Sequence, residues 1–324
     1  MLRLTSSGPV SLGGLAGFCL SGVTITMQHL LSIDDLNPTI LKQLFVETQK
    51  ILNDATPIRE SKHHVVATMF FEPSTRTKLS FSLAAQKLGF SLLDFDQQKS
   101  SAIKGESLID TLQNLQAMGV NLFVMRHPKQ MIFDEIHTAL KPTSHLINAG
   151  DGTNQHPTQA LIDVFTLQQH YPDLTQIKIA IVGDIKHSRV AHSNIALLKM
   201  LGVEQIRLIG PADFLNTIEG FECFEDFDQG IKDVDAIMLL RIQKERMSQA
   251  QIPNLATYAE QYGLSPDKFA LANKNAIILH PGPVNRNVEI STDLIEHPRS
   301  QILKQTQHGV AIRMALLQYF VKPV

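Results

Sequence analysis

The stretch VVATMFFEPSTRTKLSFSLAAQKLG, residues 65–89, holds the pattern on which the fold depends. It opens on an almost unbroken apolar run, which is typical of a strand buried on both faces. Pro73 closes the turn that follows, and apolar residues then recur at helical spacing. Four polar residues fall on the first turn of that helix: Ser74, Thr75, Arg76 and Thr77. A buried strand, a short turn and a helix together predict a parallel β–α unit.

The first turn of this helix has the composition of an anion-binding site. A helix N-terminus offers free N–H groups and a partial positive charge, to which hydroxyls and a planar guanidinium add further donors. The alternative is an ordinary N-cap made by Ser74 or Thr75, with Pro73 fixing the entry of the chain. A cap explains one hydroxyl but leaves two hydroxyls and Arg76 without a role, so we expect phosphate binding. A Walker A loop (G-x-x-x-x-G-K-[ST]) is absent from the sequence.

Strand and helix patterns alternate along the rest of the chain. The expected strands are residues 65–71, 91–96, 121–125, 144–149, 178–184, 206–210, 236–240 and 276–280. Most are short apolar runs of the fully buried kind, so we predict an α/β fold with two doubly wound parallel-sheet domains. The pattern over 156–171 predicts a helix between the two groups of strands, and 301–320 predicts a long terminal helix.

Composition agrees with this fold class and argues against several functions. A chain of 324 residues favours two domains, and its formal charge of −2 provides no overall basic field to recruit nucleic acid. Two cysteines, Cys19 and Cys223, indicate a reducing compartment, which fits the cytoplasm, and Cys223 is expected in the core. No run approaches the ~20 apolar residues of a membrane span. Residues 1–26 lack the folded pattern, so we expect a disordered extension, or a natural start at Met27.

Polar residues follow the expected strands at six places. They are Arg76, Arg126, the stretch Asp151 to His156, the stretch Asp184 to Arg189, the pair Arg241 and Gln243, and His280. Ligands of open parallel sheets bind at the carboxyl ends of the strands. We therefore expect these six segments to converge on one site.

Two of these segments suggest particular chemistry. His156 stands where a helix begins, with Gln159 one turn later, and an imidazole there can donate to a developing oxyanion. A lone histidine has an equally ordinary structural explanation, although its amide neighbours favour a site. In HPGPVNR, Pro281 and Pro283 predict a rigid turn whose carbonyls face the cleft.

Other polar stretches give weaker signals. KSSAIKGE, residues 99–106, carries Ser100 and Lys104 and reads by composition as an ordinary surface loop. His63 and His64 precede a strand with no acid or cysteine at metal-ligand spacing, so we expect no metal site there.

These motifs, in this order, resemble the catalytic chain of the aspartate carbamoyltransferase family, within the aspartate/ornithine carbamoyltransferase superfamily. The matching motifs are PSTRT, SSxxKGE, MRHP, DGxNQHPTQ, GDIxHSRV, RxQxER and HPGP, and the resemblance runs from about residue 28 to the C-terminus. It implies transfer of the carbamoyl group of carbamoyl phosphate to L-aspartate, an early step of pyrimidine synthesis, with no cofactor and no metal. It also implies a homotrimer with shared active sites, in some members joined by regulatory or dihydroorotase chains.

The resemblance further implies a division into domains. A carbamoyl-phosphate domain would cover residues 27–160, with the C-terminal helix 306–324 returning to it. An aspartate domain would cover residues 172–305, and interdomain helices would join the two.

Residue roles are carried over position by position. Catalysis is implied for Arg76, Thr77, Arg126 and His156. Carbamoyl phosphate contacts are implied for these four together with Ser74, Thr75, Gln159, Ser100 and Lys104. Aspartate contacts are implied for Lys104, Arg189, Arg241, Gln243 and the backbone of the HPGP turn, including Gly282 and Pro283. Ser100 and Lys104 would come from a neighbouring subunit, in place of the surface-loop reading.

Two alternatives stand beside this one. Ornithine carbamoyltransferase has the same architecture, but that family carries a cysteine in an HCLP turn where this chain has HPGP. Arg189 and Arg241 also suit a dicarboxylate better than a cationic side chain. A nicotinamide-dependent dehydrogenase would share the parallel sheets, yet no G-x-G-x-x-G follows any expected strand.

Overall fold

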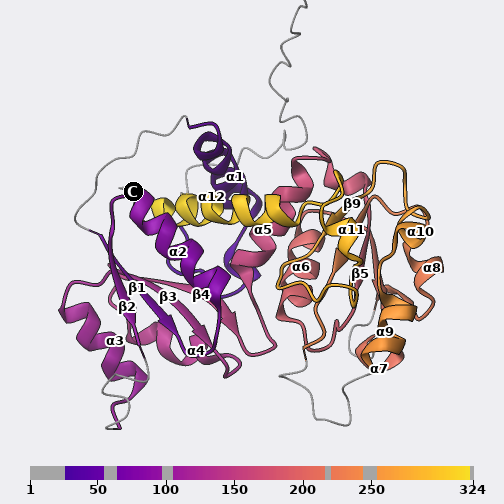
Figure 1. Ribbon diagram of the computed structural model, residues 1–324. Coiled ribbons are helices and arrows are strands. Elements are labelled where there is room, and N and C mark those ends of the chain that lie inside the picture. Colours follow the sequence, from indigo (N-terminus) through magenta and orange to yellow (C-terminus); the bar gives the residue numbers. More distant parts are fainter. Residues whose placement is uncertain (1–25, 55–63, 97–104, 216–219, 244–253, 322–324) are drawn as a thin grey trace, which may run out of the picture.

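Two separate parallel sheets, each with helices on both faces, make up the computed structural model (Figure 1). The structure describes residues 26–54, 64–96, 105–215, 220–243 and 254–321. In the first sheet the strand order is β2 (Ser91–Phe95), β1 (Val65–Phe70), β3 (Leu122–His127) and β4 (His145–Asp151). In the second it is β7 (Glu222–Phe224), β6 (Gln205–Ile209), β5 (Lys178–Val182), β8 (Ala236–Leu239) and β9 (Ile277–Leu279). The predicted α/β class with two doubly wound parallel sheets is confirmed.

Helices connect the strands within each half. The first half holds α1 (Pro38–Leu52), α2 (Thr75–Lys87), α3 (Leu108–Ala117) and α4 (Ile132–Ile136). The second holds α6 (Arg189–Met200), α7 (Ala212–Leu215), α8 (Phe227–Ile231), α9 (Leu255–Tyr262), α10 (Pro266–Phe269) and α11 (Thr292–Ile295). Short 3-10 turns occur at Ile33–Asp35, His137–Ala139 and Leu174–Gln176.

Alternate residues along the strands bury opposite faces of each sheet. In β1, Val66 belongs to an apolar cluster with residues of α1 and α2, whereas Ala67 and Met69 belong to another with residues of α3 and α4. In β5, Ile181 likewise joins the cluster that includes α6, and Val182 joins the one that includes α8 and α9. Burial on both faces explains why these strands read as continuous apolar runs.

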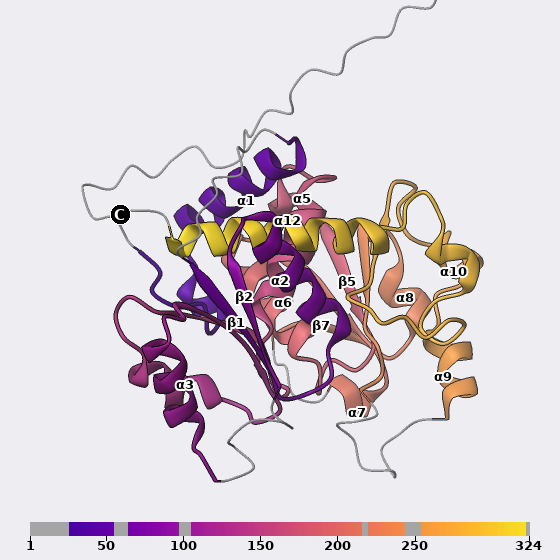
Figure 2. The same cartoon turned by 60° about the vertical axis from the view of Figure 1, so that its left-hand side comes forward.

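Two long helices tie the halves together. The helix α5 (Pro157–Gln168) follows β4, and α12 (Ile302–Val321) follows the second sheet and packs against α1, α2 and α5. Figures 1 and 2 show α12, in yellow, lying across the molecule beside these helices. The expected return of the C-terminal helix to the first half is thus confirmed. One apolar cluster includes residues of α5, α12 and both sheets, so the two halves share a core.

The sequence patterns did not predict the strand β7, and they predicted a buried position for Cys223 that the structure does not show. The strand β7 has only three residues, lies at the edge of its sheet and is largely exposed, so it presents no apolar run. Cys223 lies in β7 and is exposed, so the prediction of a core cysteine is wrong. The edge strand β2 is also more exposed than a fully buried strand.

Two segments with predicted properties lie outside the residues that the structure describes. Residues 1–25 of the expected extension and residues 97–104, which include Ser100 and Lys104, lie outside the described part. Within the described part, no helix is long and apolar enough to cross a membrane.

Candidate active site

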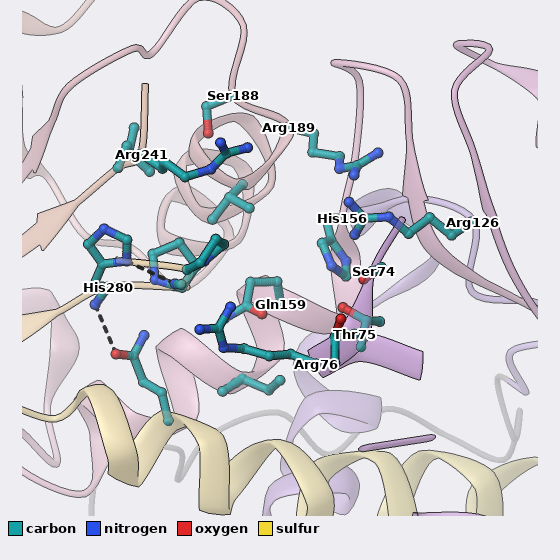
Figure 3. Close-up of a pocket in the computed structure, with 18 of the residues that line it drawn as sticks. Ser74, Thr75, Arg76, Arg126, His156, Gln159, Ser188, Arg189, Arg241 and His280 are labelled. Carbon is teal, nitrogen blue, oxygen red and sulfur yellow. Dashed lines mark hydrogen bonds between the residues drawn. The ribbon is translucent and has the colours of Figure 1, made fainter. Parts of the chain in front are cut away.

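A cleft of about 960 Å³ lies at the carboxyl ends of strands from both sheets. All six polar segments identified from the sequence contribute to its lining, through Arg76, Arg126, His156, Arg189, the pair Arg241 and Gln243, and His280. In Figure 3, Arg241 and His280 lie on one side of this space and Arg126, Ser74 and Thr75 on the other. The expected convergence of the six segments is therefore observed.

The N-terminus of α2 faces this cleft. Ser74 is the N-cap residue, but its hydroxyl accepts no hydrogen bond from the first turn of the helix. The N-cap explanation for this hydroxyl is therefore not the one the structure adopts. Ser74, Thr75, Arg76 and Thr77 all line the cleft, so the helix presents N–H groups, hydroxyls and a guanidinium together.

Glu72, directly after β1, joins two arginines from different parts of the chain. Its Oε1 lies 2.6 Å from Arg126 Nε at the end of β3. The same oxygen accepts a hydrogen bond from Arg189 at the start of α6 in the second half. One carboxylate thus holds an arginine from each half side by side, as Figure 3 shows for the two guanidinium groups.

Arg189 is buried, and local backbone features fix its position. Ser188 caps α6 by accepting from Ala191 N at 3.2 Å, so Arg189 begins the helix. Its guanidinium donates to the Gly152 carbonyl at 3.1 Å. The guanidinium also packs against Gly150, where a Cβ would lie 2.7 Å from Arg189 Cζ. Only glycine at position 150 leaves room for the guanidinium.

His156 and Gln159 enter the cleft from the start of α5. The backbone N–H of His156 donates to Ser193 Oγ at 2.8 Å, which attaches the N-terminus of α5 to α6. Thr158 Oγ1 lies 3.4 Å from His156 Nδ1. Gln159 Nε2 donates to Asp163 Oδ1 at 2.7 Å, one turn further along the helix.

The HPGP turn closes the cleft beyond β9. His280 is fully buried, and burial, reinforced by the nearby charges of Arg76 and Arg241, lowers its pKa to about 3. Its imidazole is therefore neutral, with Nδ1 accepting from Gly282 N at 2.8 Å. Gly282 has a φ of +67°, and a Cβ there would lie 3.1 Å from Arg76 Cζ. The turn and the start of α2 are thus in close contact.

Arg241 and Gln243 follow β8 on the second side of the cleft. Gln243 Nε2 donates to the Arg241 carbonyl at 3.2 Å, and Arg241 lies 3.5 Å from Gln243 Oε1. The pair is therefore held together at one place on the wall.

The charge of the described lining is strongly positive. Five arginines line it, at 76, 126, 189, 241 and 313, and Glu72 is the one acidic residue among the described lining residues. Such a cleft favours ligands that carry several negative charges. Among the residues described, no group of three or more histidines, cysteines and acids is arranged to hold a metal ion.

Sequence reasoning missed three residues of this site. Glu72 stands inside the quoted motif, but its two partners come from distant segments that no local pattern connects. Arg313 of α12 lines the cleft and is buried, and burial lowers its pKa to about 9. Asp163 lies behind the residues that line the cleft. Its only signal in the sequence is that an acidic residue stands within an apolar helical pattern, four residues after Gln159.

The fold and the cleft define a two-domain α/β protein with an arginine-rich cleft, suited to anionic small molecules, between two parallel sheets. Comparison with known proteins makes this specific. The sequence pattern of the aspartate/ornithine carbamoyltransferase carbamoyl-P binding domain matches residues 28–169, and that of the Asp/Orn binding domain matches residues 175–320. The chain belongs to the aspartate/ornithine carbamoyltransferase family.

Within this family, the chain is similar to catalytic subunits of aspartate carbamoyltransferases. The chain is 45% identical over 301 residues to the aspartate carbamoyltransferase catalytic subunit of Stenotrophomonas maltophilia (strain K279a), covering 90% of this chain and 95% of that protein. It is 46% identical over 301 residues to the corresponding subunit of Xanthomonas euvesicatoria pv. vesicatoria, with the same coverage. Among solved structures, Trypanosoma cruzi aspartate transcarbamoylase in complex with carbamoyl phosphate superposes with a TM-score of 0.80 at 27% identity, covering 93% of this chain and 98% of that one. The catalytic subunit of M. jannaschii aspartate transcarbamoylase superposes with a TM-score of 0.77 at 32% identity, covering 91% of this chain and 98% of that one.

Proposed function

We propose that this chain is an aspartate carbamoyltransferase, which transfers the carbamoyl group of carbamoyl phosphate to the amino group of L-aspartate. The products are N-carbamoyl-L-aspartate and phosphate, and the reaction serves de novo pyrimidine biosynthesis. The observation that carries the proposal is the cleft itself: the donor-rich N-terminus of α2 in the first half faces Arg189 and Arg241 of the second half. A dianionic phosphate and a dicarboxylate match these two groups of donors.

Each half of the chain is proposed to bind one of the two substrates. Residues 27–160 with the C-terminal helix 306–324 would hold carbamoyl phosphate, and residues 172–305 would hold aspartate. The domain names and bounds of the two matching family patterns support this assignment. Ser74, Thr75, Arg76 and Thr77 then take the phosphate, and Arg189, Arg241 and Gln243 take the aspartate carboxylates. Gln159 takes the carbamoyl nitrogen.

The reaction needs stabilisation of one developing charge. The aspartate amine attacks the carbonyl carbon, a C–N bond forms, and phosphate leaves with the electrons of the broken C–O bond while the amine loses a proton. Negative charge builds on the carbonyl oxygen, where Arg76, Thr77, Arg126 and His156 are proposed to donate. One such donor is typically worth about 3–4 kcal/mol, or roughly 10²–10³ in rate. Fixing both substrates in one cleft supplies much of the remaining acceleration.

Aspartate is favoured over ornithine by the charges that the second half of the chain contributes to the cleft. Arg189 and Arg241 both line it, and a cationic ornithine side chain would meet repulsion there. The HPGP turn also lacks the cysteine that marks the ornithine family. These two features support a dicarboxylate substrate.

A shared active site in a homotrimer is the further part of the proposal, with the cytoplasm as its place of action. Ser100 and Lys104 would reach the cleft of the next subunit. Mixing inactive Arg76→Ala and Lys104→Ala chains should then restore about a quarter of wild-type activity, since random assortment gives ~½ × ½ intact sites. Mixed samples that exchange subunits, as native mass spectrometry can verify, and stay inactive would exclude sharing.

The activity is tested with purified protein, carbamoyl phosphate and either L-aspartate or L-ornithine. The expected product is N-carbamoyl-L-aspartate, identified by mass, with ornithine giving far slower turnover. The Arg76→Ala variant, checked for unchanged melting temperature, serves as the inactive control. Preferential formation of citrulline would replace aspartate by ornithine as the substrate, and no turnover with either would reject carbamoyl transfer.

A further inference from the structure

A buried polar network lies behind the wall of the cleft and centres on Asp163 of α5. Asp163 is fully buried, and three side-chain amides converge on its carboxylate. Gln159 Nε2 lies 2.7 Å and Gln305 Nε2 2.8 Å from Oδ1, and Asn194 Nδ2 lies 2.9 Å from Oδ2. The amides come from α5, α12 and α6, so one carboxylate joins three helices.

Two of these amides have orientations that are fixed from their other ends. Gln305 Oε1 accepts from the backbone N–H of His280 at 2.9 Å, and a backbone N–H can only donate. The NH₂ group of Gln305 must therefore face Asp163. Asn194 Nδ2 also donates to the Val190 carbonyl at 3.0 Å, which can only accept. Asp163 thus meets donors from both neighbours, and an ionised carboxylate, which only accepts, is the group that satisfies them.

The same carboxylate decides which end of Gln159 faces the substrate. With one N–H of its Nε2 bonded to Asp163, the amide of Gln159 keeps Oε1, its acceptor, and the second N–H for the cleft that it lines. Among the described residues, no hydrogen bond is donated to that oxygen. Gln159 therefore presents a hydrogen-bond acceptor to the cleft.

We propose that Asp163 is a positioning residue that sets substrate specificity, by holding Gln159 Oε1 toward the cleft as the acceptor for the NH₂ group of the carbamoyl substrate. This inference rests on the proposed function. Acetyl phosphate has the same shape but carries a methyl group in place of that NH₂. It would leave Gln159 Oε1 without a donor in a buried place, and a site built to bond a polar group rejects analogues that lack it.

The protonation of Asp163 agrees with this role. Burial raises its pKa to about 6, while the hydrogen bonds from Asn194, Gln305 and Gln159 and the charge of Arg313 oppose that rise. At neutral pH the group is therefore mainly ionised and accepts from all three amides. The link from Gln305 to His280, drawn in Figure 3, extends the network to the HPGP turn.

The test compares the dissociation constants of carbamoyl phosphate, acetyl phosphate and inorganic phosphate, measured by calorimetry without aspartate. In Asp163→Ala, no acceptor remains at this position, so Gln159 loses its fixed orientation. We expect the preference for carbamoyl over acetyl phosphate to fall about ten-fold, the value of one net hydrogen bond. Gln159→Ala should lower it by a similar factor, and the double variant by no more than either single one. Inorganic phosphate, which has no carbamoyl group, should bind unchanged in every variant.

Asn194→Ala is the matched control. Asn194 bonds the same carboxylate but is not among the residues that line the cleft, so this variant should lose stability and keep the wild-type preference. An unchanged preference in Asp163→Ala, or an equal loss in Asn194→Ala, would overturn the positioning role. Failure of wild-type protein to bind carbamoyl phosphate at all would instead reject the proposed function.

Neutron diffraction of deuterated wild-type protein with carbamoyl phosphate gives a result that does not depend on any variant folding. The expected density places the Gln159 ND₂ group against Asp163 and its oxygen toward the ligand nitrogen. An ND₂ group that faces the ligand would overturn the inference.

Discussion

Gly150→Ala should weaken the binding of aspartate, although Gly150 itself is not among the residues proposed to bind it. Gly150 has a φ of +122°, and a Cβ there would lie 2.7 Å from Arg189 Cζ and 2.9 Å from Nε. Real Cβ atoms essentially never approach so closely, so the guanidinium must move. Because it is the far end of a flexible side chain, it moves at a lower cost than the backbone would.

The size of the effect follows from the contacts that Arg189 would lose. Its hydrogen bond to the Gly152 carbonyl, 3.1 Å long, and its pairing with Glu72 both depend on its present position. A hydrogen bond to a charged group is worth about 1.5–3 kcal/mol, and displacement of Arg189 from a substrate carboxylate should cost a similar amount. The KM for aspartate should therefore rise roughly 10- to 150-fold, while the KM for carbamoyl phosphate changes little.

Gly119→Ala is the matched control for backbone strain. Gly119 also has a positive φ, of +99°, but a Cβ there meets nothing within 4 Å. Both variants should lose about 1 kcal/mol of stability from the left-handed conformation, and only Gly150→Ala should alter aspartate kinetics. Steady-state rates at saturating carbamoyl phosphate measure this. An unchanged aspartate KM in folded Gly150→Ala, or an equal rise in Gly119→Ala, would refute the steric argument.

Three further predictions concern other parts of the chain. Arg241→Ala or Gln243→Ala should raise the KM for aspartate far more than that for carbamoyl phosphate, and equal effects in steady-state kinetics would contradict the division between the halves. Deleting residues 1–26 should leave kcat and Tm essentially unchanged, because folded pattern begins near Met27; a loss of several degrees in calorimetry would disprove it. Burial raises the pKa of Asp163 from 3.8 to about 6, so between these pH values the folded protein binds more protons than the unfolded one. The stability of the wild-type protein relative to Asp163→Asn should therefore fall as pH rises through this window, by roughly 3 kcal/mol at most. Denaturant titrations of both proteins at several pH values measure that slope, and a flat or rising difference would contradict it.

Local pattern was sufficient for most of the fold. The strands of both sheet interiors are short apolar runs bounded by turns, and burial on both faces makes such runs visible in sequence. The edge strand β7 was missed because its three residues are mostly exposed, and Cys223 was misassigned for the same reason. Periodicity reports burial, so it loses its signal where a sheet ends.

The candidate site was predictable in its members but not in its contacts. Polar residues after parallel strands meet at the carboxyl-end edge of their own sheet, which brings Arg76 and Arg126 together in the first half and places Arg241 at the corresponding edge of the second. That Glu72 would join Arg126 to Arg189 depends on how the two halves are placed, and no local pattern carries that information. Ser100 and Lys104 lie outside the described residues, so their role stays a prediction.

One cleft is proposed to bind a phosphate at the N-terminus of α2 in the first half and a dicarboxylate at Arg189 and Arg241 of the second half. N-(phosphonacetyl)-L-aspartic acid, with which T. cruzi aspartate transcarbamoylase has been crystallised, carries a phosphonate in place of the phosphate and two carboxylates in one molecule. Calorimetry should show that wild-type protein binds it far more tightly than phosphate or aspartate alone, and that Arg76→Ala and Arg241→Ala each weaken its binding by at least about ten-fold. Binding that either folded variant leaves unchanged would show that the two halves do not form one site.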